Sequence, residues 1–119
     1  MNLKKVLGST IVALAFAVLV SATTQAKDSR DILIPHDASL AGSHFASGRY
    51  HMQWETHIPS ATVTFVQRNK VVATAEGKVV DRGKRYPGNE VVTHQNNDGS
   101  WVIDEIRLGN SSEAIVFQE

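Results

Sequence analysis

The chain has 119 residues, no cysteine, and twelve basic against twelve acidic side chains. The lack of cysteine excludes a lipid anchor on a cysteine thiol, disulfides, zinc ribbons and thiol catalysis. The even charge balance lacks the concentrated positive field that nucleic-acid binding uses, so no nucleic-acid partner is expected.

The N-terminus has the pattern of an export signal. Lys4 and Lys5 precede an apolar run over residues 6–22, and small residues follow as far as Ala26. We therefore expect residues 1–26 to be a signal peptide. An uncleaved N-terminal anchor is the alternative, although the run is close to the shortest that can span a bilayer.

Cleavage after Ala26, or at a second acceptable site after Ala22, leaves a single β-domain over residues 27–119. About ninety residues can bury one core without disulfides, but not two. We expect the domain to be exported to the periplasm or secreted into the extracellular space. No membrane contact is expected after the signal is removed.

The runs of this domain are filled by Val, Ile, Thr and aromatic residues, which favour strands, and no helical spacing is sustained. Seven strands are expected, at residues 31–35, 49–57, 61–67, 70–80, 90–95, 101–108 and 113–118. The segment 36–43 is expected to be a turn, with unusual backbone angles at Gly42 and Gly48.

The second of these strands divides its side chains by parity. Tyr50, Met52 and Trp54 fall on one face, whereas the polar residues between Arg49 and His57 fall on the other. We expect the apolar face to lie in the core and the polar face to be solvated.

Arg68-Asn69 is expected to be the two-residue loop of a hairpin. This register would pair Phe65 with Val72. Glycine inside a strand often marks a bulge, so Gly77 is the expected bulge site in the strand that follows.

Residues 81–89 are the longest predicted loop and the expected position of any ligand loop. In the strand at 101–108, Ile103 and Ile106 have opposite parity. This pattern predicts either two partly buried faces or a bulge near Asp104 and Glu105.

The strand spacing of about 8 to 12 residues, with short turns, predicts an all-β fold. We expect a small antiparallel β-sandwich of about seven strands. A small β-barrel is the alternative, because the same spacing fits both architectures.

Five histidines are the candidate metal ligands: His36, His44, His51, His57 and His94. An exported protein could bind copper or zinc through such residues. On a straight strand His51 and His57 are about 20 Å apart, too far to share one ion. A metal site therefore needs histidines from different strands to converge. Histidine-based copper or zinc binding is the alternative function; otherwise no cofactor is expected.

No catalytic constellation is visible in the sequence. His36-Asp37 resembles the base and acid of a hydrolase, but an aspartate at a strand exit is typical of a turn. No Gly-x-Ser-x-Gly motif surrounds a serine. Asp104 and Glu105 are neighbours on a strand and point to opposite sides. An enzyme such as a small hydrolase is therefore not expected.

Two features are candidates for a ligand or partner surface. Trp101 directly follows a tight turn and could present an exposed ring on which a sugar stacks. The predicted loop carries a basic and aromatic cluster, formed by Arg82, Lys84, Arg85 and Tyr86. The expected partner is a protein or a glycan.

The chain contains "HDASLAG", "SGRYHMQWE", "ATVTFVQRNKVVATAEGKVV" and "DGSWVIDEIRLG", followed by "AIVF". With the export signal, these stretches resemble a group of short, exported, uncharacterised bacterial proteins that have a Gly-x-Tyr-x-x-x-Trp strand and a valine-rich hairpin. The resemblance covers nearly all of the predicted domain and implies one exported β-domain, without assigning an activity, a ligand or a catalytic residue. The resulting expectation is a non-catalytic binding or structural module.

Overall fold

Alternation of apolar and polar residues directs this chain into strands. In the computed structural model, which describes residues 28–117, nine strands form a single open mixed sheet, and the expected all-β fold is confirmed. The strands are β3 (Asp28–Ile34), β4 (Ala38–Leu40), β5 (Ser43–Phe45), β6 (Gly48–His57), β7 (Ser60–Gln67), β8 (Lys70–Asp81), β9 (Glu90–Gln95), β10 (Trp101–Arg107) and β11 (Glu113–Val116). The predicted signal peptide lies outside the described residues. Within 28–117, no helix has the length and apolar character needed to cross a membrane.

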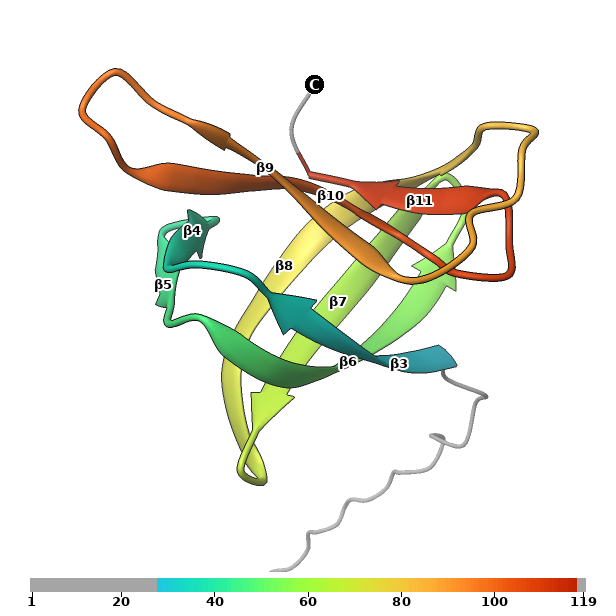
Figure 1. Ribbon diagram of the computed structural model, residues 1–119. Coiled ribbons are helices and arrows are strands. Elements are labelled where there is room, and N and C mark those ends of the chain that lie inside the picture. The colour runs from blue at the N-terminus through green and yellow to red at the C-terminus, as the bar shows by residue number, and fades with distance from the viewer. Residues whose placement is uncertain (1–27, 118–119) are drawn as a thin grey trace, which may run out of the picture.

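The sheet folds over on itself into two layers, an arrangement consistent with the expected small sandwich (Figure 1). Strands β3, β6, β7 and β8 follow one another in one layer, and β8 pairs with β11, which leads to β10 and β9 in the other. The strand pairings are antiparallel as expected, except that β4 runs parallel to β10.

The expectation of seven strands missed a short hairpin. Residues 36–43 were expected to be a turn, but they contain β4 and the first residue of β5. Ser39 of β4 pairs with Val102 of β10, while Leu40 and Phe45 are buried in the core. A three-residue strand is too short to show an alternating pattern, so its pairing with β10 is decided by tertiary structure.

The core lies between the two layers. Tyr50, Met52 and Trp54 of β6 point inward and are 3%, 0% and 6% exposed, which confirms their expected place. The ring of Phe65 on β7 meets that of Phe45 edge-on, with centroids 5.0 Å apart. Because alternate residues of β6 fill the core, the polar residues between them form its outer face.

The β7–β8 hairpin has the expected two-residue loop. Arg68 and Asn69 have φ of +53° and +65°, the left-handed conformation that such a loop requires. The expected pairing of Phe65 with Val72 is wrong, because Phe65 pairs with Ala73. A bulge beside the loop leaves Val72 without a partner on β7, and it shifts the register by one residue.

Gly77 is not the bulge site that we expected. It pairs regularly with Ala61. A Cβ atom at Gly77 would lie 2.7 Å from Ile115 Cγ2 and 3.0 Å from Phe117 Cε1. The glycine therefore makes room for side chains from β11 and the residue that follows it.

Of the two alternatives predicted for β10, the bulge near Asp104 and Glu105 is present. The register against β9 shifts between Ile103 and Glu105. Ile103 and Ile106 are both fully buried despite their opposite parity. The bulge changes the phase of the strand, so both residues reach the core.

The two ends of the sheet, β3 and β9, meet through side chains. Arg30 Nη1 donates to Asn89 Oδ1 at 2.8 Å and to the carbonyl oxygen of Gly109 at 2.9 Å. Asn89 Nδ2 donates to the Asp31 carbonyl at 3.3 Å, and Asn89 Oδ1 also accepts from the Gly109 amide at 2.8 Å. A single asparagine before β9 therefore links both ends of the sheet.

Candidate functional site

The five histidines come from different parts of the sheet. Within residues 28–117, no three His, Cys, Asp or Glu side chains gather as a metal site requires. His51 Nδ1 is 2.8 Å from Asp31 Oδ1, and His94 Nδ1 is 2.7 Å from Asp104 Oδ1. Both pairs join neighbouring strands. The convergence on which the copper or zinc hypothesis depends is not seen in this part of the chain.

The other three histidines have separate surroundings. The ring of His36 lies against that of Trp101, with centroids 4.1 Å apart. His57 Nε2 is 3.8 Å from Glu55 Oε1 on the same strand. His44 is exposed on β5.

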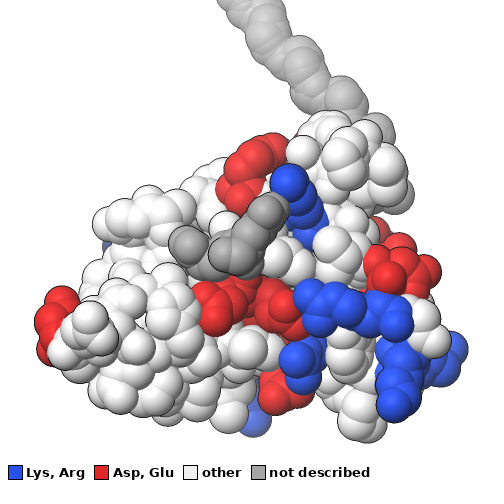
Figure 2. Space-filling view, turned by 90° about the horizontal axis from the view of Figure 1, so that it is seen from above, with Lys and Arg blue, Asp and Glu red and all other residues white. Residues whose placement is uncertain are grey.

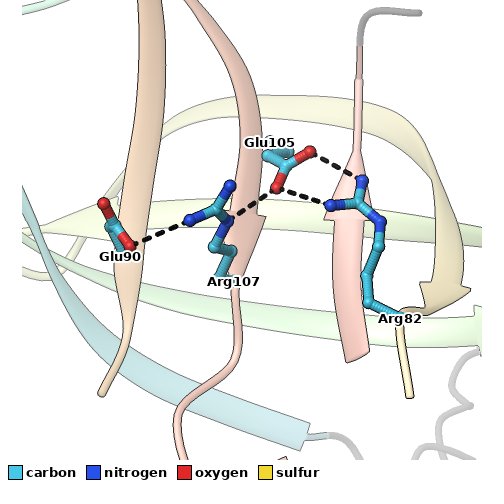
Figure 3. A network of polar contacts seen from close by, with 4 residues as sticks. All are labelled: Arg82, Glu90, Glu105 and Arg107. Carbon is cyan, nitrogen blue, oxygen red and sulfur yellow. Dashed lines mark hydrogen bonds and ion pairs between the residues drawn. The ribbon is translucent and has the colours of Figure 1, made fainter. Parts of the chain in front are cut away.

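One acidic side chain is nearly buried on the outer face of β10. The side chain of Glu105 is 11% exposed. Arg82 Nη2 donates to its Oε1 at 2.9 Å, and Arg107 Nε donates to its Oε2 at 2.9 Å. Arg107 Nη1 also reaches Glu90 Oε1 at 3.3 Å, so the four side chains form a line across the strands (Figure 3). The Arg107 guanidinium lies over the Tyr86 ring, 5.3 Å from its centroid.

This network keeps Glu105 ionised. Burial by itself raises the pKa of Glu105, but hydrogen bonds from Arg82 and Arg107 outweigh burial, and the pKa lies below its ordinary value of 4.5. The same bonds raise the pKa of both arginines. The hydrogen bond between Arg82 and the Glu105 carboxylate therefore links the start of the 82–89 loop to β10.

Only two of the four predicted ligand-surface residues of the loop take part in this network or contact it. Arg82 and Tyr86 contact its members, whereas Lys84 and Arg85 are exposed and have no side-chain hydrogen bond or ion pair to any described residue. Basic side chains adjoin acidic ones on the face seen in Figure 2.

Trp101 is less exposed than we expected. It is half-buried, packs against the core, and lines a pocket of about 240 Å³. The pocket lies between the β4–β5 hairpin and the turn before β10, and its polar lining is Asp37, Ser39, His44 and Ser100. His36 contacts the Trp101 ring but does not line the pocket.

An open groove of about 800 Å³ lies on the outer face of β3, β6 and the β7–β8 hairpin. Most of the residues that line it are polar in type, and they include Asp31, Arg49, His51, Gln53, Gln67 and Arg68. The three residues from β6 point outward because the residues between them point into the core. The groove is thus the outer face of the strand whose inner face carries Tyr50, Met52 and Trp54.

Two arginines of the groove have no counter-charge. Within residues 28–117, neither Arg49 nor Arg68 has a side-chain hydrogen bond or ion pair. Gln67 Nε2 donates to the Arg49 carbonyl at 3.0 Å, which ties the hairpin to β6. The Asp31 carboxylate in the groove is already paired with His51. The groove therefore contains two guanidinium groups without an ion pair and one carboxylate that has one.

No family model, curated protein or solved structure matches the chain.

Sequence reasoning did not single out the arginines of the groove. Arg49 was placed on the polar face of its strand, and Arg68 was placed in the hairpin loop. Their meeting depends on the pairing of β6 with β7, which puts His51 opposite Val66. The sequence did contain a usable signal for this groove: a polar strand face that carries Arg49, next in the chain to a hairpin whose loop carries Arg68.

Proposed function

We propose that this protein is an exported, non-catalytic binding module whose ligand lies in the groove across β3, β6 and β7. Export is inferred from the N-terminal pattern of residues 1–26. The observation that carries the binding proposal is the presence of Arg49 and Arg68 in one open groove, both without a counter-charge among residues 28–117.

The lining of the groove favours an anionic ligand that also carries hydroxyl groups. A guanidinium group binds a carboxylate through two parallel hydrogen bonds, and Arg49 and Arg68 are both free to do so. Gln53 and Asn69 add amide groups, each of which can donate and accept hydrogen bonds. An acidic sugar combines these features, because it has one carboxylate and several hydroxyls.

The Asp31–His51 pair is the one feature of the groove that could serve catalysis. A carboxylate beside a histidine is the arrangement of a general base. Both side chains are well exposed, at 76% and 43%, and Ser47 lies four residues before His51, about 13 Å along an extended strand. Without a nucleophile in reach, we assign this pair to ligand binding.

The groove can be tested by titrating the purified protein with trigalacturonate, with maltotriose as the neutral control. Amide NMR shifts are expected at β6 and the β7–β8 loop with the acidic sugar only. Arg49→Gln and Arg68→Gln should each weaken binding by about tenfold, as expected when a charged hydrogen bond is lost.

Arg85→Gln is the matched control, because Arg85 is an exposed and unpaired arginine outside the groove. It should bind trigalacturonate like the wild type. The proposal is overturned if trigalacturonate leaves the groove amides unshifted, or if Arg85→Gln weakens binding as much as Arg49→Gln. Equal effects would mean that only net charge matters.

A further inference from the structure

A hydrogen bond joins the lining of the groove to the lining of the Trp101 pocket. Ser47 lines the groove and Asp37 lines the pocket. The Ser47 amide donates to Asp37 Oδ1 at 3.0 Å. A lining residue of the groove, on the link between β5 and β6, is therefore in direct contact with a lining residue of the pocket, just before β4.

The pocket has the composition of a site for one sugar ring. Trp101 offers an apolar aromatic surface, and a pyranose has an apolar face formed by its C–H groups. Around the indole, the His44 ring can both donate and accept hydrogen bonds. Ser39 and Ser100 add hydroxyl oxygens that can accept from sugar hydroxyls, since their own hydrogens are donated to the Trp101 carbonyl and to Asp98 Oδ1. His36 lies against the Trp101 ring at 4.1 Å and supports it from outside the pocket.

We infer that the groove and the Trp101 pocket are adjoining subsites for one chain, an acidic oligosaccharide, with a carboxylate at Arg49 and Arg68 and a sugar ring at Trp101. This inference rests on the proposed function of the groove. It adds the length of the ligand and the position of a second contact. Occupying two linked subsites raises affinity because the second contact forms within the same complex.

An acidic peptide is the competing ligand class. An extended peptide gains affinity from main-chain hydrogen bonds to a free strand edge. The groove instead lies on the face of β6, whose two edges are already paired with β3 and β7. A saccharide needs side-chain hydrogen bonds and an aromatic surface, which are what the groove and the pocket provide.

The test compares hexagalacturonate with trigalacturonate by isothermal titration. The hexamer is expected to bind at least tenfold more tightly, and it should shift the indole NMR signal of Trp101, which the trimer leaves in place. Trp101→Leu should remove the gain of the hexamer and keep the affinity for the trimer. His44 is exposed, so His44→Ala should reduce the extra affinity for hexagalacturonate without disturbing the core. His57→Ala is the control, because His57 lines neither the groove nor the pocket.

The outcomes separate the two proposals. If trigalacturonate binds at the groove but hexagalacturonate binds no more tightly, the second subsite is wrong and the groove proposal stands. The same conclusion follows if the higher affinity for hexagalacturonate persists in both His44→Ala and Trp101→Leu. If neither oligomer binds, the proposed function itself fails. A hexaglutamate peptide that binds as tightly as hexagalacturonate and shifts the same signals would overturn the assignment to a saccharide.

Discussion

Arg82 Nη2 lies 2.9 Å from Glu105 Oε1, and this bond connects a side chain that is 41% exposed to one that is 11% exposed. The pair joins the end of the β8 segment to β10, two parts of the chain separated by 23 residues. Because Glu105 is nearly buried, its charge depends on the two arginines that surround it.

Replacement of Arg82 by glutamine is expected to destabilise the fold by about 1 to 2 kcal/mol. A hydrogen bond to a buried charge contributes this much, reduced here by the exposure of Arg82. Chemical denaturation measures the change. Arg85→Gln removes the same charge from an unpaired neighbour and should cost less than about 0.5 kcal/mol. Equal losses in the two variants would contradict a specific role for the Glu105 contact.

The stability of the fold should depend on pH through Glu105. The folded pKa of Glu105 lies below its ordinary value of 4.5, so its contribution is fully present above that value and is lost as the pH falls through the folded pKa. Glu105→Gln should therefore differ most from the wild type at pH 7 and least near pH 3. Unfolding curves across this range give the difference, with Glu113→Gln as the exposed control. A difference in unfolding free energy that does not change with pH would contradict the claim that the ionised Glu105 carboxylate stabilises the fold.

Gly77→Ala is expected to destabilise the protein by about 1 to 3 kcal/mol, the usual cost of overpacking a core. The new methyl group would meet Ile115 at 2.7 Å and Phe117 at 3.0 Å. Thermal unfolding measures the loss. Gly88→Ala is the control, since a Cβ atom there meets nothing within 4 Å. If Gly77→Ala melts like the wild type, β8 and β11 do not approach as closely as described.

Asn89→Ala should loosen the contact between the two ends of the sheet. The change removes three hydrogen bonds of the Asn89 side chain, which accepts from Arg30 and from the Gly109 amide and donates to the Asp31 carbonyl. The free energy of unfolding is expected to fall by about 1 to 3 kcal/mol. The Gly109 amide should then exchange its hydrogen faster, which NMR can follow. Asn97→Ala, in the exposed β9–β10 turn, should leave that rate unchanged. Unaltered exchange in Asn89→Ala would show that other contacts close the sheet.

The predictable parts of the fold are those with a local cause. Tyr50, Met52 and Trp54 repeat every second residue along a ten-residue strand, so the buried face was visible in the sequence. The hairpin at Arg68-Asn69 was also predictable, because a two-residue turn between two valine-rich runs is a local signal. The bulge at Val72 was not, since it depends on how β8 packs against its neighbours.

The sequence alone determined the strands other than the short β4 and β5, the buried face of β6, the two-residue loop at Arg68-Asn69 and the separation of His51 from His57, because each follows from a pattern over a few residues. Only the tertiary structure decided that β4 pairs with β10, that Glu105 lies between Arg82 and Arg107, and that Arg49 and Arg68 share one groove. These relationships join residues from different strands. They depend on register and sheet twist, which are selected by the packing of the whole core and leave no mark in a short stretch of sequence.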